Sequence, residues 1–584
     1  MNIAAASIKR LRVLVLACPV LALAQSVSVS INTATTVRAV DERVFGINAV
    51  IWDPHAATSQ TISLLQEAGI RTIRIPGGSL SDEYHWRLNK SIDRANPGQN
   101  NTWTWWSSMR NFADLITGLN AQTFVTVNYG SGTPEEAAAW VAYANAATTS
   151  TTTIGADTSG YDWQSAGTGS ALRAAAPLAT DDGMNFLRAS RATPYGLKYW
   201  EIGNECYGQP WETDLNSKPH DPTTYAQRAK VYIEKMKAVD PTIKVGVVVT
   251  ASETDYANGY TRSVTNSRTG VSRTGWTPVV LATLRELGVT PDLVIYHRYE
   301  QGPEALQPGN GESDAKLLQK AKTWPDDAAA IRRMVGDYLG TAGASVEIVV
   351  TENNSVYSNT GKQTTSLVNG LFLADSVANV MQTEINALMW WDTRNGTDFA
   401  NNNSSSLYGW RNYGDYGILS SPVAGGPSTY YEAYPTYYAI KLLSKFARHG
   451  DTVVQATSGS SLLSVFAVKT VAGGVNLLAI NKDPTNSVTA SIAVNGFTPA
   501  SSANVYSYGK VQDDAARTGS GSTDLASSTM SISGASFSAS FPSYSLTVIS
   551  LTPASTPTTP TTPTTPTTPP SSGGGGGGGG GGAP

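Results

Sequence analysis

The sequence predicts a (β/α)8 barrel followed by an antiparallel β-sandwich. Three observations lead to this prediction. Eight short β-rich apolar runs recur between residues 43 and 396, and helical patterns lie between them. From about residue 452 the chain changes to alternating apolar and polar residues, which is typical of strands with one buried face. Strand–helix alternation repeated in this way is what a barrel requires, and a doubly wound open sheet is the alternative.

The expected elements follow one another in order along the chain. The clearest helix covers 222–240, where Tyr225, Ala229 and Tyr232 fall on one face, and where Asp221 can cap the first turn. A last helix at 435–446 closes the barrel. The eight expected strands are 43–50, 71–78, 123–130, 198–205, 244–250, 293–299, 345–353 and 387–396; the other expected helices are 58–68, 107–119, 134–145, 279–287, 326–339 and 363–381.

The start of the chain predicts export. Residues 1–24 carry Lys9, Arg10 and Arg12, then an apolar run, then the small-x-small signal Ala22-Leu-Ala24, which together are typical of a secretory signal peptide. Cys18 could be a lipidation site, but the bulky Leu16 two residues before it and the continuing apolar run favour simple cleavage. We therefore expect a secreted protein, extracellular or periplasmic.

The rest of the chain divides into four parts. Residues 25–40 are expected to add a strand to the sandwich, 41–449 to form the barrel, and 450–552 to form the sandwich. Residues 553–584 are Thr-Pro repeats and a glycine run, a linker or tail that cannot bury a core and after which a carbohydrate-binding module could be missing. Residues 146–192, rich in Thr, Ser, Ala and Gly, are expected to form a long loop on the active face.

Composition excludes several classes of function. The formal net charge is −4 and no basic block occurs, which argues against a nucleic acid partner. No apolar run after the first 24 residues reaches the roughly 20 residues that a membrane span needs. The five histidines form no short-range cluster with each other or with cysteine, so we expect no metal, and the chemistry proposed below needs no cofactor.

Two glutamates end two of the expected strands. Glu205 ends the fourth, in Lys198-Tyr-Trp-Glu-Ile-Gly-Asn-Glu205, and Glu352 lies near the end of the seventh, in Glu347-Ile-Val-Val-Thr-Glu-Asn353. Active sites of such barrels collect at the carboxyl ends of the strands, and strands four and seven face one another. Hydrolysis of a glycoside with retention needs a carboxylic acid and a carboxylate placed in this way. The structural alternative is that each glutamate is only satisfied by loop donors.

These motifs resemble clan A of the glycoside hydrolases, which has Asn-Glu on strand four and Glu on strand seven. Further motifs resemble the α-L-arabinofuranosidases of glycoside hydrolase family 51, over about residues 40–550. The motifs that carry the resemblance are Ile73-Arg-Ile-Pro-Gly-Gly78 with Tyr84-His-Trp86, Val127-Asn-Tyr-Gly-Ser-Gly-Thr-Pro-Glu-Glu136 with Trp140, and residues 198–205.

The resemblance implies a role for each candidate residue. Glu205 would be the acid/base, Glu352 the nucleophile, and Arg74 the cation that keeps Glu352 ionised. The residues that the resemblance places on the substrate or beside the two carboxylates are Arg74, Asn128, Asn204, His297, Tyr299 and Trp391, although Trp390 could point inward in place of Trp391 because neighbouring strand residues face opposite ways. The expected partner is a polysaccharide or oligosaccharide substrate.

Departures from the family leave the sugar open. The nucleophile segment reads Thr351-Glu-Asn353, where family 51 usually has Asp-Glu-Trp, and the Arg-x-Pro-Gly-Gly and Tyr-x-Trp elements also occur in family 44 β-glucanases. The leading hypothesis is a retaining α-L-arabinofuranosidase acting on plant cell wall polysaccharide. The alternatives are an endo-β-1,4-glucanase or xyloglucanase and, from another class, a non-catalytic carbohydrate-binding protein. The 146–192 loop and Trp103, Trp105, Trp106 and Trp211 are expected to shape the pocket or cleft.

Overall fold

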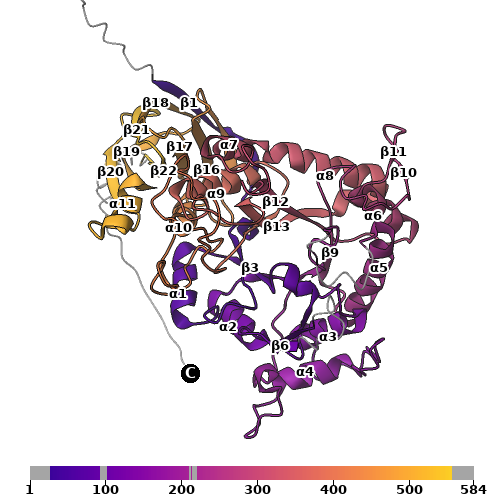
Figure 1. The fold of residues 1–584 in the computed structure, drawn as a ribbon. Coiled ribbons are helices and arrows are strands. Elements are labelled where there is room, and N and C mark those ends of the chain that lie inside the picture. Colours follow the sequence, from indigo (N-terminus) through magenta and orange to yellow (C-terminus); the bar gives the residue numbers. More distant parts are fainter. Residues whose placement is uncertain (1–25, 93–101, 210–211, 213–219, 555–584) are drawn as a thin grey trace, which may run out of the picture.

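The computed structural model describes residues 26–92, 102–209, 212 and 220–554. Eight parallel strands close into a barrel in the order β12-β13-β14-β2-β3-β7-β8-β9, which confirms the predicted barrel (Figure 1). Each expected strand is present, although most are shorter than the sequence pattern suggested. The barrel strands are β2 (Gly46–Asn48), β3 (Thr72–Ile75), β7 (Gln122–Val127), β8 (Tyr199–Ile202), β9 (Lys244–Val248), β12 (Leu293–Gln301), β13 (Glu347–Val356) and β14 (Ala387–Trp390).

Helices surround the barrel. The sequence signals set their ends: α5 begins where the Asp221 carboxylate accepts hydrogen bonds from the Thr223 and Thr224 amides, and Pro222 occupies its first turn. The helices are α1 (Ser59–Ala68), α2 (Met109–Leu119), α3 (Pro134–Asn145), α5 (Pro222–Val239), α6 (Trp276–Glu286), α7 (Asp314–Lys320), α8 (Trp324–Leu339), α9 (Leu367–Val380) and α10 (Pro435–Phe446). Short insertions after β3 and β9 add β4 (Tyr84–His85), β5 (Lys90–Ile92), β6 (Thr102–Thr104), β10 (Val264–Thr265) and β11 (Ser272–Arg273).

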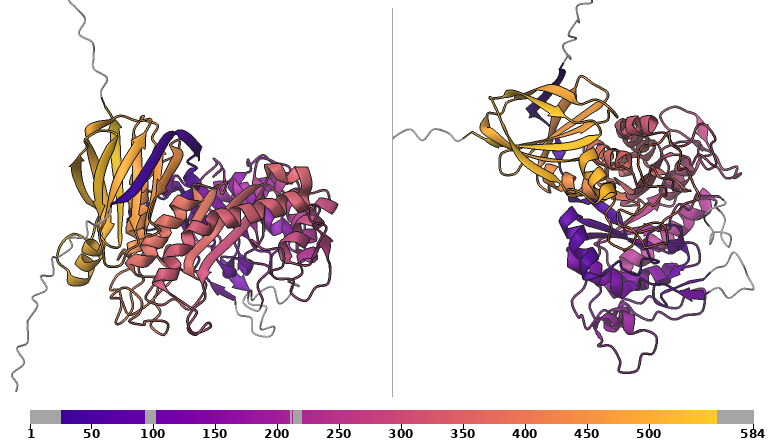
Figure 2. Two further views of the ribbon diagram at one scale, coloured as in Figure 1. Left: turned by 90° about the horizontal axis from the view of Figure 1, so that it is seen from above. Right: turned by 60° about the vertical axis from the view of Figure 1, so that its left-hand side comes forward.

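The carboxyl-terminal region forms the expected β-sandwich. Nine strands join edge to edge and curl around a core that includes Ile31, Leu477, Ile492 and Phe537 (Figure 2). All neighbours are antiparallel except β1 and β18, which run parallel, so the first strand of the chain lies inside the last domain. The strands are β1 (Val27–Ala39), β15 (Thr452–Ser458), β16 (Leu463–Lys469), β17 (Val475–Asn481), β18 (Val488–Asn495), β19 (Pro499–Gly509), β20 (Ala526–Ser531), β21 (Ser536–Phe541) and β22 (Ser545–Pro553), with helix α11 (Lys510–Thr518) after β19.

Helix α9 lies between the barrel and the sandwich. Nearly all of its side chains are buried, because β13 and β14 pack on it from the barrel, and β17 and β22 from the sandwich. Its Asp375 forms an ion pair with Lys482, which directly follows β17, at 3.0 Å between Oδ2 and Nζ. A second buried pair joins Arg411 of the barrel to Asp513 of α11 at 3.1 Å. The two domains therefore share one continuous packed interface.

Residues 146–192 do not form the expected loop on the active face. They follow α3 and precede β8, so they leave the barrel at the end opposite the carboxyl ends of its strands. The segment contains a helix, α4 (Ala166–Ala174), and the buried Arg173 fixes it by donating to the carbonyl oxygens of Tyr143 and Ala146. Only the tip of the segment reaches the end of the barrel where the carboxyl ends of the strands lie, and there Trp163 stacks on Trp86. Composition predicts a loop here but not the end of the barrel on which it lies, which follows from its position after a helix.

Three expectations lie outside the described residues. The expected signal peptide at 1–24, the expected role of Trp211 and all but the first two residues of the 553–584 tail cannot be compared with the structure. Among the described residues, no helix is both long and apolar enough to span a membrane.

The α9 ion pair leads to a test of the domain interface. Asp375→Ala should lower the free energy of unfolding by about 3–5 kcal/mol, because it leaves the buried Lys482 ammonium without its counter-charge. Denaturant titration followed by tryptophan fluorescence measures this. The control is Asp114→Ala, which removes an exposed pair with Arg110 and should cost about 1 kcal/mol or less. Equal losses in the two variants would show that the interface pair does not stabilise the fold.

Candidate active site

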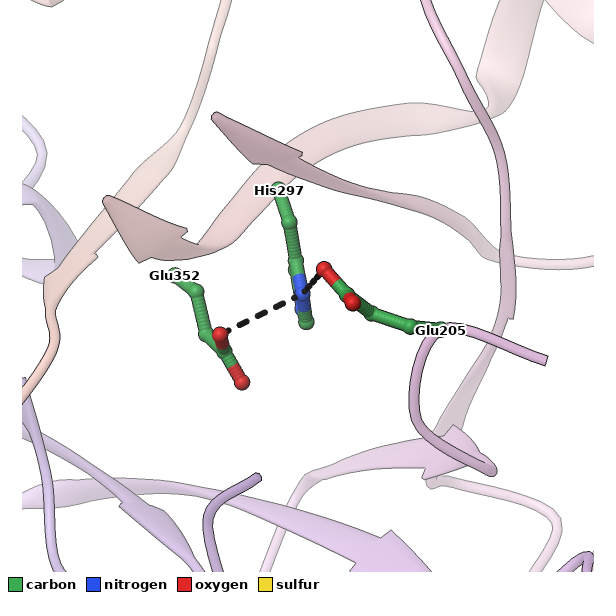
Figure 3. Close-up of side chains that lie close together, drawn as sticks. All are labelled: Glu205, His297 and Glu352. Carbon is green, nitrogen blue, oxygen red and sulfur yellow. Dashed lines mark hydrogen bonds and ion pairs between the residues drawn. The ribbon is translucent and has the colours of Figure 1, made fainter. Parts of the chain in front are cut away.

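Glu205 and Glu352 meet at the mouth of the barrel. Glu205 follows β8, Glu352 lies on β13, and His297 of β12 stands between them (Figure 3). One carboxylate oxygen of each glutamate and a ring nitrogen of His297 all lie within 4.8 Å of one another. A pair of carboxyl groups this close suits retaining glycosidases, in which they are about 5–5.5 Å apart, and is too close for inverting ones, at about 6.5–9.5 Å.

An irregularity in strand pairing aims Glu352 into the site. The register of β12 and β13 passes from Tyr296–Val350 to His297–Glu352, so Thr351 is left over between two paired positions. A residue inserted in this way turns the side chains that follow it. The Thr351 hydroxyl lies 3.0 Å from Nε2 of His297 and orients that ring toward the two glutamates.

Two donors hold the Glu352 carboxylate. Nη1 of Arg74 donates to Oε1 at 2.8 Å, and the Tyr299 hydroxyl donates to Oε2 at 2.6 Å. Both partners are the ones that the resemblance implied. Only 5% of Glu352 is exposed, so these hydrogen bonds replace those that water would give to the carboxylate. The arrangement leaves Glu352 anchored at both oxygens and oriented toward the barrel mouth.

Arg74 of β3 is fully buried and uses all three nitrogen atoms. Nε donates to Glu201 at 2.9 Å, and Nη2 donates to the Asn204 side chain at 2.8 Å. Nη1 is shared between Glu352 and the side chain of Asn48, which lies 3.1 Å away. Burial by itself would lower the pKa of Arg74, but the carboxylates of Glu201 and Glu352 raise it above its ordinary value. The guanidinium thus joins the ends of four barrel strands.

Glu205 stands on a tight turn that ends β8. Its φ of 38° lies in the left-handed region, which a residue other than glycine adopts at some cost, and Gly203 before it has a φ of 72°. A Cβ on Gly203 would come within 2.4 Å of Cys206 Sγ, so only glycine fits there. The Glu205 Oε1 atom lies 3.0 Å from His297 Nδ1 and 3.3 Å from the Tyr207 hydroxyl, which donates to it. Glu205 is more exposed than Glu352 and so has a path to water.

The amide of Asn204 is held on both sides. Its oxygen accepts from Arg74, and its Nδ2 donates to Glu212 at 3.1 Å. Its backbone N–H donates to Asp82 at 2.9 Å, and the other oxygen of Asp82 accepts from the Tyr129 N–H of the β7 loop at 2.8 Å. The buried Asp82 therefore fixes the loops after β7 and β8 to each other.

Two expected substrate residues have different surroundings. The Asn128 side chain is occupied within its own loop, since it donates to Ser131 Oγ at 2.9 Å and accepts from the Ser131 N–H at 2.8 Å. The structure does not bring it to the two glutamates. For strand β14 the open choice is resolved: Trp390 packs in the core against Phe372, whereas Trp391 lies over Gly77 and Gly78. A Cβ on Gly78 would come within 2.5 Å of the Trp391 ring, so the glycines make room for it.

Sequence reasoning missed several residues of this site. Asn48 ends strand β2, and the rule that polar strand ends line the site would have found it. Asp392 lies two residues after β14, so the same rule would have found it, whereas Asp82 and Glu212 had no such signal because neither lies at the end of a barrel strand. Burial, together with nearby acidic groups, raises the pKa of Glu212 and of Asp392 well above ordinary values. The surroundings of both side chains thus disfavour a negative charge on them.

Among the described residues, Glu205, His297 and Glu352 are also the set of three close enough to hold a metal ion. Their existing contacts fit acid–base chemistry better. Arg74 already supplies a positive charge next to Glu352, and a cation beside that guanidinium would be repelled.

No protein-family model matches the chain. Over 199 residues it is 27% identical to a probable α-L-arabinofuranosidase C of Aspergillus clavatus, a match that covers 33% of this chain and 32% of that protein. A match of 27% over 203 residues is found with α-L-arabinofuranosidase C of Emericella nidulans, again over 33% of this chain and 32% of that protein. The matched stretch thus spans about a third of the length of these curated relatives, and the resemblance to arabinofuranosidases that the motifs indicated is confirmed.

The solved structures that are similar show the fold. The family 51 α-L-arabinofuranosidase of Thermotoga petrophila has a TM-score of 0.63 at 16% identity and covers 90% of this chain and 100% of its own. A family 44 xyloglucanase of Paenibacillus polymyxa has a TM-score of 0.57 at 14% identity, with 91% and 100% covered. The chain therefore has the barrel-and-sandwich fold that enzymes of both families share, and in sequence it is similar to the α-L-arabinofuranosidases.

Proposed function

We propose that the chain is a retaining glycoside hydrolase that releases α-L-arabinofuranose from arabinan or arabinoxylan of plant cell walls. The observation that carries this proposal is the placement of Glu205 and Glu352 within 4.8 Å of each other at the barrel mouth. Their surroundings differ in a way that suits two roles. Glu352 is buried and held by Arg74 and Tyr299, whereas Glu205 is more exposed and has His297 and the Tyr207 hydroxyl beside it.

In the first step, Glu352 attacks the anomeric carbon while Glu205 gives its proton to the departing oxygen. The charge on Glu352 favours a proton on the nearby Glu205 before this step. Arg74 and Tyr299 hold the attacking carboxylate in line, so less orientation is lost on reaching the transition state. The bond between the sugar and Glu352 forms as the bond to the leaving oxygen breaks.

In the second step, Glu205 takes a proton from water, and that water attacks the sugar. The bond to Glu352 breaks, and the sugar leaves with its original configuration. Glu205 can now act as a base because Glu352 no longer carries a charge next to it. Its position toward solvent gives the water access, and the His297 ring, fixed by Thr351, keeps its carboxylate directed at the reacting carbon.

The relatives matched by sequence carry the name α-L-arabinofuranosidase, and this name supports arabinofuranose as the sugar released. The alternative, an endo-acting β-glucanase or xyloglucanase, is favoured by one observation, the similar fold of a family 44 xyloglucanase. We also propose that the protein is secreted and acts on polymers outside the cell, which the leader pattern at 1–24 supports.

Substitution of the two glutamates tests the assigned roles. Glu352→Ala should reduce kcat by about 10⁴-fold or more on every substrate, since no covalent sugar adduct can form. Glu205→Ala should lose about 10²- to 10⁴-fold on polysaccharide but much less on an aryl glycoside, whose leaving group needs no proton. Added azide should restore turnover in Glu205→Ala and give a glycosyl azide of retained configuration. Circular dichroism confirms folding. Full activity in Glu352→Ala would remove the nucleophile assignment.

A substrate screen tests the sugar. Purified protein should release arabinose from aryl α-L-arabinofuranoside and from arabinoxylan, with arabinose as the one small product in a time course by ion-exchange chromatography. Activity on xyloglucan or carboxymethylcellulose, oligosaccharide products and no hydrolysis of the aryl arabinofuranoside would instead support the endo-acting alternative. In either case, NMR of the first product anomer shows whether the product keeps the anomeric configuration of the substrate.

A further inference from the structure

A groove separate from the two glutamates lies between the barrel and the sandwich. Its barrel wall consists of residues 312–315 at the start of α7 and residues 405–410 of the loop after β14, and its sandwich wall includes Pro484, Asp514, Arg517 and Tyr544. The volume is about 700 Å³, within the range of about 300–1,000 Å³ found for ligand sites. Both barrel segments follow the carboxyl ends of strands, so the groove opens at the same end of the barrel as Glu205 and Glu352.

Trp410 offers this groove a rigid aromatic surface. The side chain is 40% exposed, although a tryptophan usually buries most of its area. Its position is fixed, because the Arg411 guanidinium covers one side of the ring at 4.1 Å and Nε1 donates to Asp513 at 3.4 Å. A ring that is already immobile loses little entropy when a ligand packs on its open side.

One further aromatic ring adds to the surface. Tyr408 of the barrel is partly exposed, and it meets Tyr544 of the sandwich, which is only 4% exposed, edge to face at 5.2 Å. The Lys510 ammonium lies over both rings, at 5.7 Å and 5.3 Å. Aromatic faces of this kind pack against the C–H side of a sugar ring, which is apolar, while the hydroxyl groups at its edge need hydrogen-bond partners.

Such partners line the groove. Glu312 is only 7% exposed, and it belongs to the lining of the groove. Burial raises the pKa of Glu312 to about 7, although hydrogen bonds from the Asn402 side chain and the Glu304 backbone lower it, so the group can accept or donate near neutrality. On the other wall, Asp514 and Arg517 form an exposed ion pair at 3.2 Å. These side chains offer hydrogen bonds to a neutral polyhydroxylated ligand.

We infer that this groove is a second carbohydrate-binding site, which holds a part of the polysaccharide away from the bond that is cut. The inference rests on the proposed function, since it takes the same polymer as the substrate. Three features favour a sugar chain over a protein or a nucleic acid as the ligand. They are the aromatic rings, the charged side chains that can bind hydroxyl groups, and the position of the groove at the same end of the barrel as Glu205 and Glu352.

Binding to soluble arabinoxylan tests the groove. In a Glu352→Ala background, which prevents turnover, Trp410→Ala should weaken binding about tenfold in affinity gel electrophoresis. With Glu352 intact, the same substitution should leave kcat/KM on aryl α-L-arabinofuranoside within about twofold, because that small substrate does not reach the groove. Tyr161→Ala is the matched control: it is also 40% exposed and also has an arginine over its ring, Arg87 at 4.5 Å, but lies in the 146–192 segment.

The outcomes separate the groove from the proposed function. Arg517→Ala is a second groove variant. The Arg517 side chain is 49% exposed, so its removal should not disturb folding, and this variant should also weaken binding. If the protein hydrolyses the aryl arabinofuranoside, unchanged arabinoxylan binding in both groove variants, or an equal loss in Tyr161→Ala, would overturn the inference. Absence of aryl arabinofuranosidase activity would overturn the proposed sugar alone, because the same binding series on xyloglucan still reports on the groove. Weaker binding there in the groove variants supports the site, and unchanged binding to both polymers rejects it.

Discussion

The site depends on one buried guanidinium. Arg74 is the cation to which the ends of β2, β3, β8 and β13 are tied, through Asn48, Glu201, Asn204 and Glu352. A buried charge is costly unless it is fully paired, so each of its partners must stay in place for the barrel to close well. The same constraint that stabilises the barrel mouth therefore also sets the direction of the Glu352 carboxylate.

The other acids around the site have surroundings that differ from those of Glu352. Burial raises the pKa of Glu212 and of Asp392 well above ordinary values, while Asp82 accepts hydrogen bonds from backbone N–H groups of two loops. Burial thus disfavours a negative charge on Glu212 and Asp392, whereas Glu352 has the Arg74 guanidinium beside it. Glu205 differs again, because it lies nearer solvent on a strained turn.

The sandwich contributes more than stability. It packs on α9, supplies Lys482 to the buried ion pair with Asp375, and holds the β14 loop through Asp513 and Arg411. That last pair also fixes Trp410 at the groove. The sandwich supplies no residue to the two glutamates and their partners, but it forms one wall of the groove that opens at the same end of the barrel.

The sequence by itself determined the barrel, the sandwich and the two glutamates, because strand periodicity and polar strand ends are local signals. It also placed Arg74, Tyr299 and His297 through motif resemblance. Only the tertiary structure decided that Trp391 and not Trp390 faces Gly78, that Asn128 serves its own loop, and that 146–192 packs behind α3. The tertiary structure was also needed to find Asp82, Glu212 and the Trp410 groove. Segments far apart in the chain form their surroundings, and no local sequence pattern predicts burial or pairing between such segments.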